Sequence, residues 1–325
     1  MRWLFLFFSV SAWAKLVVVC PPFISASPET LLYDPDSARD EIAKPFCALR
    51  EALEKEGYEI KITTNEDPVE PCTAVLVFNE SHMAHLLRSH PKERCFFFVL
   101  EPPFILPAAY DRQLKQVYGK IFVLFDHMID NKNYFKFHYP QPRQKMFENT
   151  PSFRDKRLCT MIANYRPFNH PKALYRAREA SIRFFGPTGD FDLYGGGWDP
   201  STQAWRGKVP GKWEVLERYR FCLCYENMQN QEGYITEKIF DCFVAGCVPV
   251  YWGATNIDTY VPKECFIDRR AFKTNKELYA FLKNMDEPTY QTYIDAIRRY
   301  FDSPQAQLFS INHFVELIMN ELRQL

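Results

Sequence analysis

The chain has 325 residues, enough for two domains of about 150 residues each. Its 40 basic and 40 acidic residues cancel to a formal net charge of zero, so there is no overall positive field for gathering nucleic acid, and no nucleic-acid partner is expected. Aromatic residues make up 16% of the sequence, a content that argues against disorder.

The first 14 residues leave two interpretations open. Arg2 precedes an apolar run at residues 3–10, and residues 12–14 match the small-residue pattern of a signal-peptide cleavage site. The apolar run is too short to span a bilayer. Residues 1–14 are therefore expected to be either a short export signal or membrane-associating leader, or an ordinary N-terminal extension.

The rest of the first half alternates predicted strands and helices. The predicted strands cover 16–20, 59–63, 73–79, 95–100 and 120–125, and the predicted helices cover 40–56, 81–89 and 107–118. Such alternation is typical of a mainly parallel sheet with helices on both faces. We therefore expect a Rossmann-like domain over residues 15–140.

A second domain is expected after a linker. Residues 138–157 contain three prolines and no apolar periodicity, which indicates an interdomain linker at 141–157. The predicted strands of the second half cover 158–163, 191–194, 221–225 and 248–252, and its helices cover 171–185, 212–219, 275–284, 288–301 and 305–323, with another beginning near 237. Residues 158–325 are thus expected to form a second α/β domain, with a cleft between the two domains.

The stretch from Phe221 to Pro262 carries the most unusual chemistry. Glu226 and Asn227 follow a buried strand, and Thr236 is placed to cap a helix that starts with Glu237 and Lys238. Strand, helix and strand at this spacing form a βαβ unit, whose ligands bind at the carboxyl ends of the strands.

Four polar residues of this unit are expected around one crevice, namely Asn227, Tyr234, Glu237 and Lys238. A lysine in the first helical turn opposes the helix dipole unless an anion binds there, and a diphosphate is the natural anion. Glu237 is suited to accept hydrogen bonds from ribose hydroxyls. The alternative is an ordinary solvated Glu–Lys pair.

Two other candidates lie elsewhere. Glu101 directly follows the strand predicted at 95–100, a position that suits a general base, although a solvated turn residue would look the same. Arg176 and Arg178 stand early in the helix predicted at 171–185, where a guanidinium could bind phosphate oxygens. A basic solvated helix face is the alternative.

The other sequence patterns give little evidence of function. His82, His85 and His90 lack the spacing of a metal site, and Asp190-Phe-Asp192 matches a motif that is common by chance. No metal site is therefore expected. The ten cysteines, which include no CxxC motif, are expected to be buried and reduced rather than paired in disulfides.

The block YENMQNQEGYITEKIFDCFVAGCVPVYWG, residues 225–253, closely resembles the signature of the α-1,3/1,4-fucosyltransferases, a GT10-type family with a GT-B fold. FDLYGGGW at 191–198 and LEPPFI at 100–105 are similar to two further segments of that family. The resemblance covers about 95–270 and implies two Rossmann-like domains facing a cleft.

The resemblance also implies roles for individual residues. Glu101 would be the general base that deprotonates the acceptor hydroxyl. Asn227 and Lys238 would contact the diphosphate, Tyr234 the nucleotide or its phosphates, and Glu237 the ribose. Arg178 matches the family's phosphate-binding arginine, with Arg176 as the alternative.

The implied activity is inverting transfer of fucose from GDP-fucose to a glycan or glycoconjugate hydroxyl, with α-1,3 linkage to an N-acetylglucosamine-containing acceptor expected. A related transferase with another nucleotide-sugar, or a non-catalytic glycan- or nucleotide-binding protein, remains the alternative. No cofactor is required in this interpretation, although a divalent metal could stimulate the reaction. The expected location is membrane-associated through the leader, Golgi-like or cytosol-facing.

Overall fold

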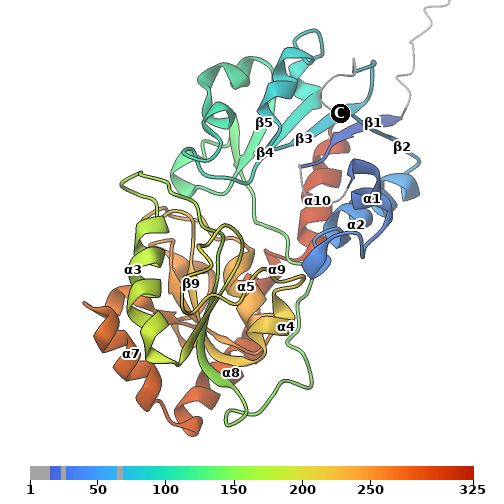
Figure 1. The fold of residues 1–325 in the computed structure, drawn as a ribbon. Helices are drawn as coiled ribbons and strands as arrows, with labels where there is room; N and C mark the ends of the chain where they lie inside the picture. Colours follow the sequence, from blue (N-terminus) through green and yellow to red (C-terminus); the bar gives the residue numbers. More distant parts are fainter. Residues whose placement is uncertain (1–14, 23–26, 64–68) are drawn as a thin grey trace, which may run out of the picture.

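The computed structural model describes residues 15–22, 27–63 and 69–325, so the leader predicted at 1–14 lies outside the described residues. The chain forms two β-sheets, which lie in separate lobes in Figure 1. The first contains β1 (Leu16–Cys20), β2 (Glu59–Ile62), β3 (Ala74–Phe78), β4 (Cys95–Val99), β5 (Lys120–Val123) and β6 (Tyr134–Lys136). The second contains β7 (Arg157–Ile162), β8 (Phe191–Tyr194), β9 (Tyr219–Tyr225), β10 (Val248–Trp252) and β11 (Ile267–Asp268). The predicted α/β class is confirmed.

Every strand pairing in the described residues is parallel. The first sheet has the order β2-β1-β3-β4-β5-β6 and the second the order β11-β10-β9-β7-β8. Strands of parallel sheets are buried on both faces and therefore read as continuous apolar runs. In β4, Phe96 and Phe98 enter the core on one face, whereas Phe97 and Val99 enter the core on the other.

Helices cover these sheets. They are α1 (Pro28–Tyr33), α2 (Lys44–Lys55), α3 (Tyr175–Phe185), α4 (Trp213–Leu216), α5 (Glu237–Val244), α6 (Ile257–Tyr260), α7 (Asn275–Asn284), α8 (Glu287–Phe301), α9 (Pro304–Gln307) and α10 (Ile311–Leu322). α1, α2 and α10 lie together beside the first sheet (Figure 1), and their apolar side chains share one core with it. The opposite face of that sheet is covered mainly by short 3₁₀ segments and loops.

The last helix crosses back to the first lobe. Phe314, Ile318 and Leu322 of α10 are buried in the same core as Phe78 and Phe98 of the first sheet. The second domain predicted at 158–325 includes this helix, whereas the structure packs it against the first sheet. An amphipathic helix shows which face it buries but not which sheet will receive that face.

Several predicted helices are shorter or broken. The one expected at 107–118 is two 3₁₀ turns, because Asp111 takes extended backbone angles and its carboxylate accepts from the N–H of Gln113 at 2.9 Å. The helix expected at 305–323 is divided into α9 and α10 by Ser310, which caps α10 through the N–H of His313. The helix expected at 81–89 is a 3₁₀ turn at Ser81–His85.

The segment between β6 and β7, residues 137–156, forms no helix or strand. The linker predicted at 141–157 lies in it except for Arg157, which begins β7. β6 itself was not predicted, because its three residues carry too little pattern to identify a strand without its neighbour β5.

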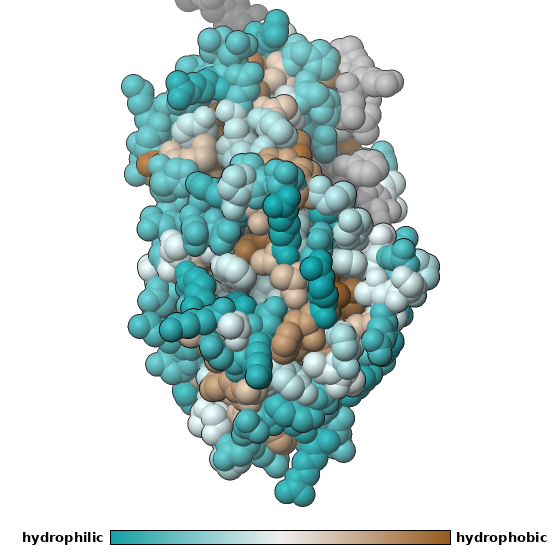
Figure 2. All heavy atoms as spheres, turned by 60° about the vertical axis from the view of Figure 1, so that its left-hand side comes forward, coloured by the Kyte–Doolittle hydropathy of each residue, from teal (hydrophilic) through white to brown (hydrophobic). Residues whose placement is uncertain are grey.

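None of the helices formed by the described residues is long and apolar enough to cross a membrane. The face shown in Figure 2 is mostly hydrophilic, with smaller hydrophobic areas.

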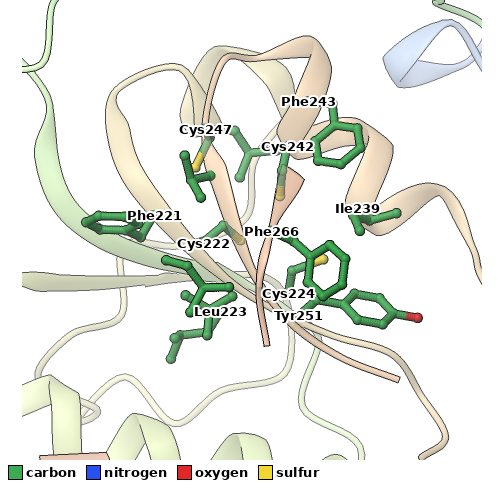
Figure 3. Close-up of a cluster of buried hydrophobic side chains, with 14 of the residues drawn as sticks. Phe221, Cys222, Leu223, Cys224, Ile239, Cys242, Phe243, Cys247, Tyr251 and Phe266 are labelled. Atoms are coloured by element: carbon green, nitrogen blue, oxygen red, sulfur yellow. The ribbon is translucent and has the colours of Figure 1, made fainter. Parts of the chain in front are cut away.

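The cysteines belong to the cores. All ten are free and buried, as expected from the sequence. Figure 3 shows part of the second core, where Cys222 and Cys224 of β9 lie among aromatic and aliphatic side chains near Cys242 of α5 and Cys247. Burial raises the pKa of the Cys242 thiol well above its usual value, so this group behaves as a small apolar side chain.

Candidate functional site

A cavity of about 630 Å³ lies between the two sheets and is lined by residues of both. Its walls include all of the predicted site residues, namely Glu101, Arg178, Asn227, Tyr234, Glu237 and Lys238. The reason is topological, since the carboxyl ends of parallel strands meet at one edge of each sheet. β4 leads into Glu101 on one side, and β9 leads into Asn227 on the other.

Glu101 is held by its backbone and faces the second lobe. Its carbonyl accepts from the hydroxyl of Tyr110 at 2.7 Å, and the preceding N–H, that of Leu100, donates to Asn79 at 2.7 Å. Burial raises the pKa of the Glu101 carboxyl above its ordinary value of 4.5, with Lys238, Arg166 and a hydrogen bond from Asn227 opposing the rise. A half-buried carboxylate with a raised pKa, facing positive charge across a cavity, fits a general base.

Arg178 and Asn227 form one unit on the opposite wall. Nη2 of Arg178 donates to the carbonyls of Tyr225 and Glu226 at 2.6 and 2.8 Å and to Oδ1 of Asn227 at 3.0 Å. The guanidinium also stands over the Tyr175 ring, 4.9 Å from its centroid. Arg178 is 6% exposed, and it makes no ion pair with any described residue. A buried cation without a carboxylate partner favours an anionic ligand.

The structure separates the two candidate arginines. Arg178 is buried in the cavity wall, whereas Arg176, two residues earlier on α3, is exposed and does not line the cavity. Both positions have the same residue type and the same helix, so sequence could not choose between them. Two residues along an α-helix are separated by about 200° around its axis, which places one on the buried face and the other in solvent.

Lys238 meets a buried carboxylate that the sequence did not single out. Glu226 is fully buried, and its Oε1 and Oε2 accept from the N–H and hydroxyl of Thr236 at 2.9 and 2.7 Å. Nζ of Lys238 lies 3.2 Å from Oε2 of Glu226 and donates to Thr236 Oγ1 at 2.9 Å. Thr236 occupies the N-cap position of α5, as predicted, but its hydroxyl makes no capping bond to the helix and donates to Glu226 instead. Glu226 supplies the anion at the start of α5.

Glu237 also has partners from outside its own helix. Nζ of Lys212 lies between Oε1 of Glu237 at 3.3 Å and Oδ2 of Asp241 at 2.6 Å. Burial favours the neutral acid, but Lys238 and Lys212 hold the pKa of the Glu237 carboxyl below its ordinary range. Glu237 is therefore a charged, acceptor-only group in the cavity wall. Lys212 and Asp241 were not predicted, because Lys212 precedes the segment of interest and Asp241 reads as a polar position on a buried helix.

Tyr234 is set in place by the first lobe. Its ring stacks on Phe125, with centroids 5.1 Å apart and planes 7° apart. Next to it, Asp126 pairs with Lys136 at 2.6 Å and accepts from Asn256 and Tyr260. Gly233 is required here, since it has φ of +75° and a Cβ would lie 2.1 Å from Oδ1 of Asp126.

The patterns judged empty have structural explanations. Asp192 is fully buried and accepts from Tyr219 at 2.6 Å while pairing with Arg206 at 2.7 Å, so it belongs to the core of the second sheet. His82 is exposed and lies 3.3 Å from Glu80. Among the described residues, no group of three or more His, Cys, Asp and Glu side chains could hold a metal ion.

Comparison with known proteins agrees with this architecture. The structure of an α1,3-fucosyltransferase matches with a TM-score of 0.60 over 97% of this chain and 92% of that chain, at 15% identity. A structure of an α1,3-fucosyltransferase with GDP-fucose matches with a TM-score of 0.58 over 95% and 90% of the two chains, at 16% identity. The chain therefore has the two-domain GT-B fold of glycosyltransferases, as expected.

The family follows from sequence. The model of glycosyltransferase family 10 (fucosyltransferase), C-terminal part, matches residues 133–313, more than half of the chain. An α-(1,4)-fucosyltransferase of Arabidopsis thaliana is 38% identical over 86 residues, which are 26% of this chain and 21% of that protein. The 4-galactosyl-N-acetylglucosaminide 3-α-L-fucosyltransferase 9 of Mus musculus is 27% identical over 136 residues, 41% and 34% of the two.

The chain belongs to glycosyltransferase family 10, the fucosyltransferases. The matched segments span about a third or less of the two relatives' own lengths. The match begins at residue 133, directly before β6 (Tyr134–Lys136), and ends at residue 313. Glu101 thus lies outside the matched segment, and its role is argued from its position.

Proposed function

We propose that this protein transfers fucose from GDP-fucose to a hydroxyl of a glycan or glycoconjugate, with inversion at the transferred carbon. The main support is the buried guanidinium of Arg178, which has no ion-pair partner among the described residues. Arg178 and Lys238 line one wall of the cavity, and the half-buried Glu101 lies on the opposite wall. Positive charge on one wall and a base on the other are what displacement of a diphosphate by a hydroxyl needs.

The proposed chemistry assigns one event to each wall. The Glu101 carboxylate takes the proton of the acceptor hydroxyl as its oxygen attacks C1 of fucose from the face opposite GDP. The bond from C1 to the diphosphate oxygen breaks, and its electrons leave with GDP. Arg178 and Lys238, with Asn227 and Tyr234 beside them, would bind the departing diphosphate, and Glu237 would accept from the ribose hydroxyls.

These protein cations can neutralise the charge of the leaving group, so we propose that no metal is required, although a divalent metal could stimulate turnover. For the acceptor we propose a glycan that contains N-acetylglucosamine, to which the fucose is joined by an α-1,3 linkage. The names of the relatives support this choice, since the mouse relative is a 3-α-L-fucosyltransferase of 4-galactosyl-N-acetylglucosaminide. Peripheral association with a membrane through residues 1–14, in a Golgi-like or cytosol-facing location, remains part of the proposal.

The first test is selective stabilisation by nucleotides. GDP at 100 times its dissociation constant should add about 2.7 kcal/mol to the free energy of unfolding and raise the melting temperature by several degrees. UDP and ADP at equal concentration should have little effect. Thermal melts with each nucleotide and with GDP-fucose measure this directly.

The other outcomes of that test separate the alternatives. Selective stabilisation by UDP or ADP would point to a related transferase with another nucleotide-sugar. Stabilisation by GDP, without release of GDP from GDP-fucose in the presence of any screened acceptor, would favour a non-catalytic binding protein. Stabilisation by none of the nucleotides would contradict a donor site in this cavity.

A second prediction concerns pH. Glu101 must be ionised to accept a proton, and its pKa is raised above 4.5, so kcat/KM should fall as pH decreases through that raised value. Burial also raises the pKa of Asp241, to about 6. Profiles of kcat/KM for the wild type and for Asp241→Asn distinguish the two groups. The acidic limb should persist in the variant, and its disappearance would assign the limb to Asp241.

A further inference from the structure

The position of Glu237 on α5 does not determine where its carboxylate points. Glu237 is the first residue of the helix, and its side chain is 25% exposed, so several rotamers are open to it. The side-chain contacts that restrict it come from Lys238, 3.7 Å away, and from Lys212 at 3.3 Å, in addition to a backbone hydrogen bond within Glu237 itself. Lys238 is already engaged with Glu226 and Thr236. Lys212 is the closer of the two ammonium groups and the one that donates a hydrogen bond to Glu237, so it is the better placed to orient this carboxylate.

Lys212 is itself fixed from several sides. Its side chain is 13% exposed, and Nζ donates to Oδ2 of Asp241 at 2.6 Å. The other oxygen of Asp241 accepts from the indole N–H of Trp213 at 2.9 Å, so neither Asp241 nor Lys212 can turn freely. Because Trp213 holds one oxygen of Asp241 and Lys212 the other, the ammonium of Lys212 is kept beside Oε1 of Glu237.

The remaining anchor comes from the first lobe. The backbone N–H of Lys212 donates to Oδ1 of Asp40 at 2.6 Å, and the Asp40 side chain is only 3% exposed. Asp40 and the next residue, Glu41, both have left-handed backbone angles, with φ of +56° and +57°. Two adjacent non-glycine residues adopt such angles only where the surroundings hold them, and strain of this kind gathers at functional sites.

A purely structural role explains this cluster poorly. Replacing a buried ion pair by apolar side chains of similar size is often neutral or stabilising, so the pair is weak support for a stabilising function. The cluster also lines the cavity, since Asp40, Lys212, Glu237 and Asp241 all belong to its wall. What the arrangement provides is a charged carboxylate in a defined orientation.

We propose that Lys212 is the positioning residue that orients the Glu237 carboxylate toward the ribose of the donor, and that Asp40 holds Lys212 in place from the first lobe. This inference rests on the proposed function, because it takes Glu237 as the ribose contact. It adds two residues to the donor site that do not belong to the segment at 225–253. It also makes recognition of the ribose depend on the contact between the two lobes.

The test compares two nucleotides that differ only in the ribose hydroxyls. Dissociation constants for GDP and 2′,3′-dideoxy-GDP are measured by calorimetry, and their ratio reports recognition of the hydroxyls. The wild type should prefer GDP by about tenfold or more, the size typical of a hydrogen bond to a charged group. In Lys212→Met that preference should fall to about the level of Glu237→Gln, whereas Lys212→Arg should keep part of it.

A matched control is available in the second lobe. Lys156 is 4% exposed and donates to the carbonyl of Gly246 at 2.6 Å, away from the cavity. Lys156→Met removes a buried ammonium as Lys212→Met does, and should leave the ratio unchanged. Asp40→Ala should lower the ratio, while Asp40→Asn, which keeps an oxygen acceptor for the N–H of Lys212, should retain more of it.

The outcomes can be told apart. Equal weakening of both nucleotides in Lys212→Met, with the ratio intact, would overturn the positioning role. A wild type that binds GDP without preferring it to the dideoxy form would overturn the ribose role of Glu237 and this inference with it. A wild type that binds neither nucleotide would instead contradict the proposed function. If Lys212→Met does not fold, the Asp40→Ala and Asp40→Asn pair decides, and equal ratios in both would overturn the proposal.

Discussion

Replacing Glu101 by glutamine is expected to lower the rate of fucosyl transfer by about 10²- to 10⁴-fold, the usual contribution of a general base. Glutamine keeps the volume and can keep the hydrogen bond with Asn227, but it cannot take the proton of the acceptor hydroxyl. GDP binding should be unchanged or slightly tighter, because a negative charge facing Lys238 across the cavity is removed. Initial rates with GDP-fucose and an acceptor found by screening, together with the dissociation constant of GDP, measure both quantities.

The control for this experiment is a glutamate of the same lobe outside the cavity. Glu93 is exposed, and Glu93→Gln should change neither rate nor affinity. A loss of GDP affinity in Glu101→Gln that matches the loss of rate would mean that Glu101 maintains the cavity rather than acting on the acceptor. Full activity in Glu101→Gln would place the base elsewhere.

Replacing Lys238 by methionine is expected to reduce the free energy of unfolding by about 3 kcal/mol, near the lower end for breaking a buried ion pair. The cause is Glu226, which is fully buried and would lose the cation 3.2 Å from its Oε2. The lower end applies because two hydrogen bonds from Thr236 remain. Urea denaturation measures the change. GDP affinity in this variant therefore reports instability as well as a lost phosphate contact.

The double variant Glu226→Gln/Lys238→Met separates these effects. Glutamine removes the buried charge, so the double variant should recover part of the lost stability, while GDP should still bind more weakly than in the wild type. Lys263→Met is the control, since its exposed pair with Asp258 at 4.0 Å should contribute at most about 1 kcal/mol. Wild-type stability in the single variant would show that Thr236 alone supports the Glu226 charge.

Much of the fold can be predicted from short stretches of the sequence. The run at 95–99 is apolar throughout, as expected for a buried strand of a parallel sheet, and a strand there puts the polar residue that follows it, Glu101, near the carboxyl edge. The same reasoning placed Asn227 after β9 and Lys238 in the first turn of α5. These predictions needed only periodicity over a few residues and the topology of βαβ units.

Other features depend on partners distant in the sequence. Glu226 and Lys212 are ordinary charged residues in their own segments, and they acquire roles only where α5, α4 and the first lobe meet. Oδ1 of Asp40 accepts a hydrogen bond from the N–H of Lys212, which lies 172 residues later in the sequence. No local pattern indicates that a carboxylate will be reached from such a distance, or that Asp40 will take a left-handed conformation to reach it.

Short-range pattern was thus sufficient for every described strand except β6 and β11, for the sheet edges that line the cavity and for the residue types gathered there. The reason is that side-chain alternation and strand direction follow from the backbone. Three features could be established only from the tertiary structure: the burial of Arg178 rather than Arg176 in the cavity wall, the return of α10 to the first sheet, and the ion pairs of Glu237 and Lys238. Each depends on which of several equally suitable surfaces two distant segments share. Burial and electrostatics between those segments, rather than local propensity, determine that outcome.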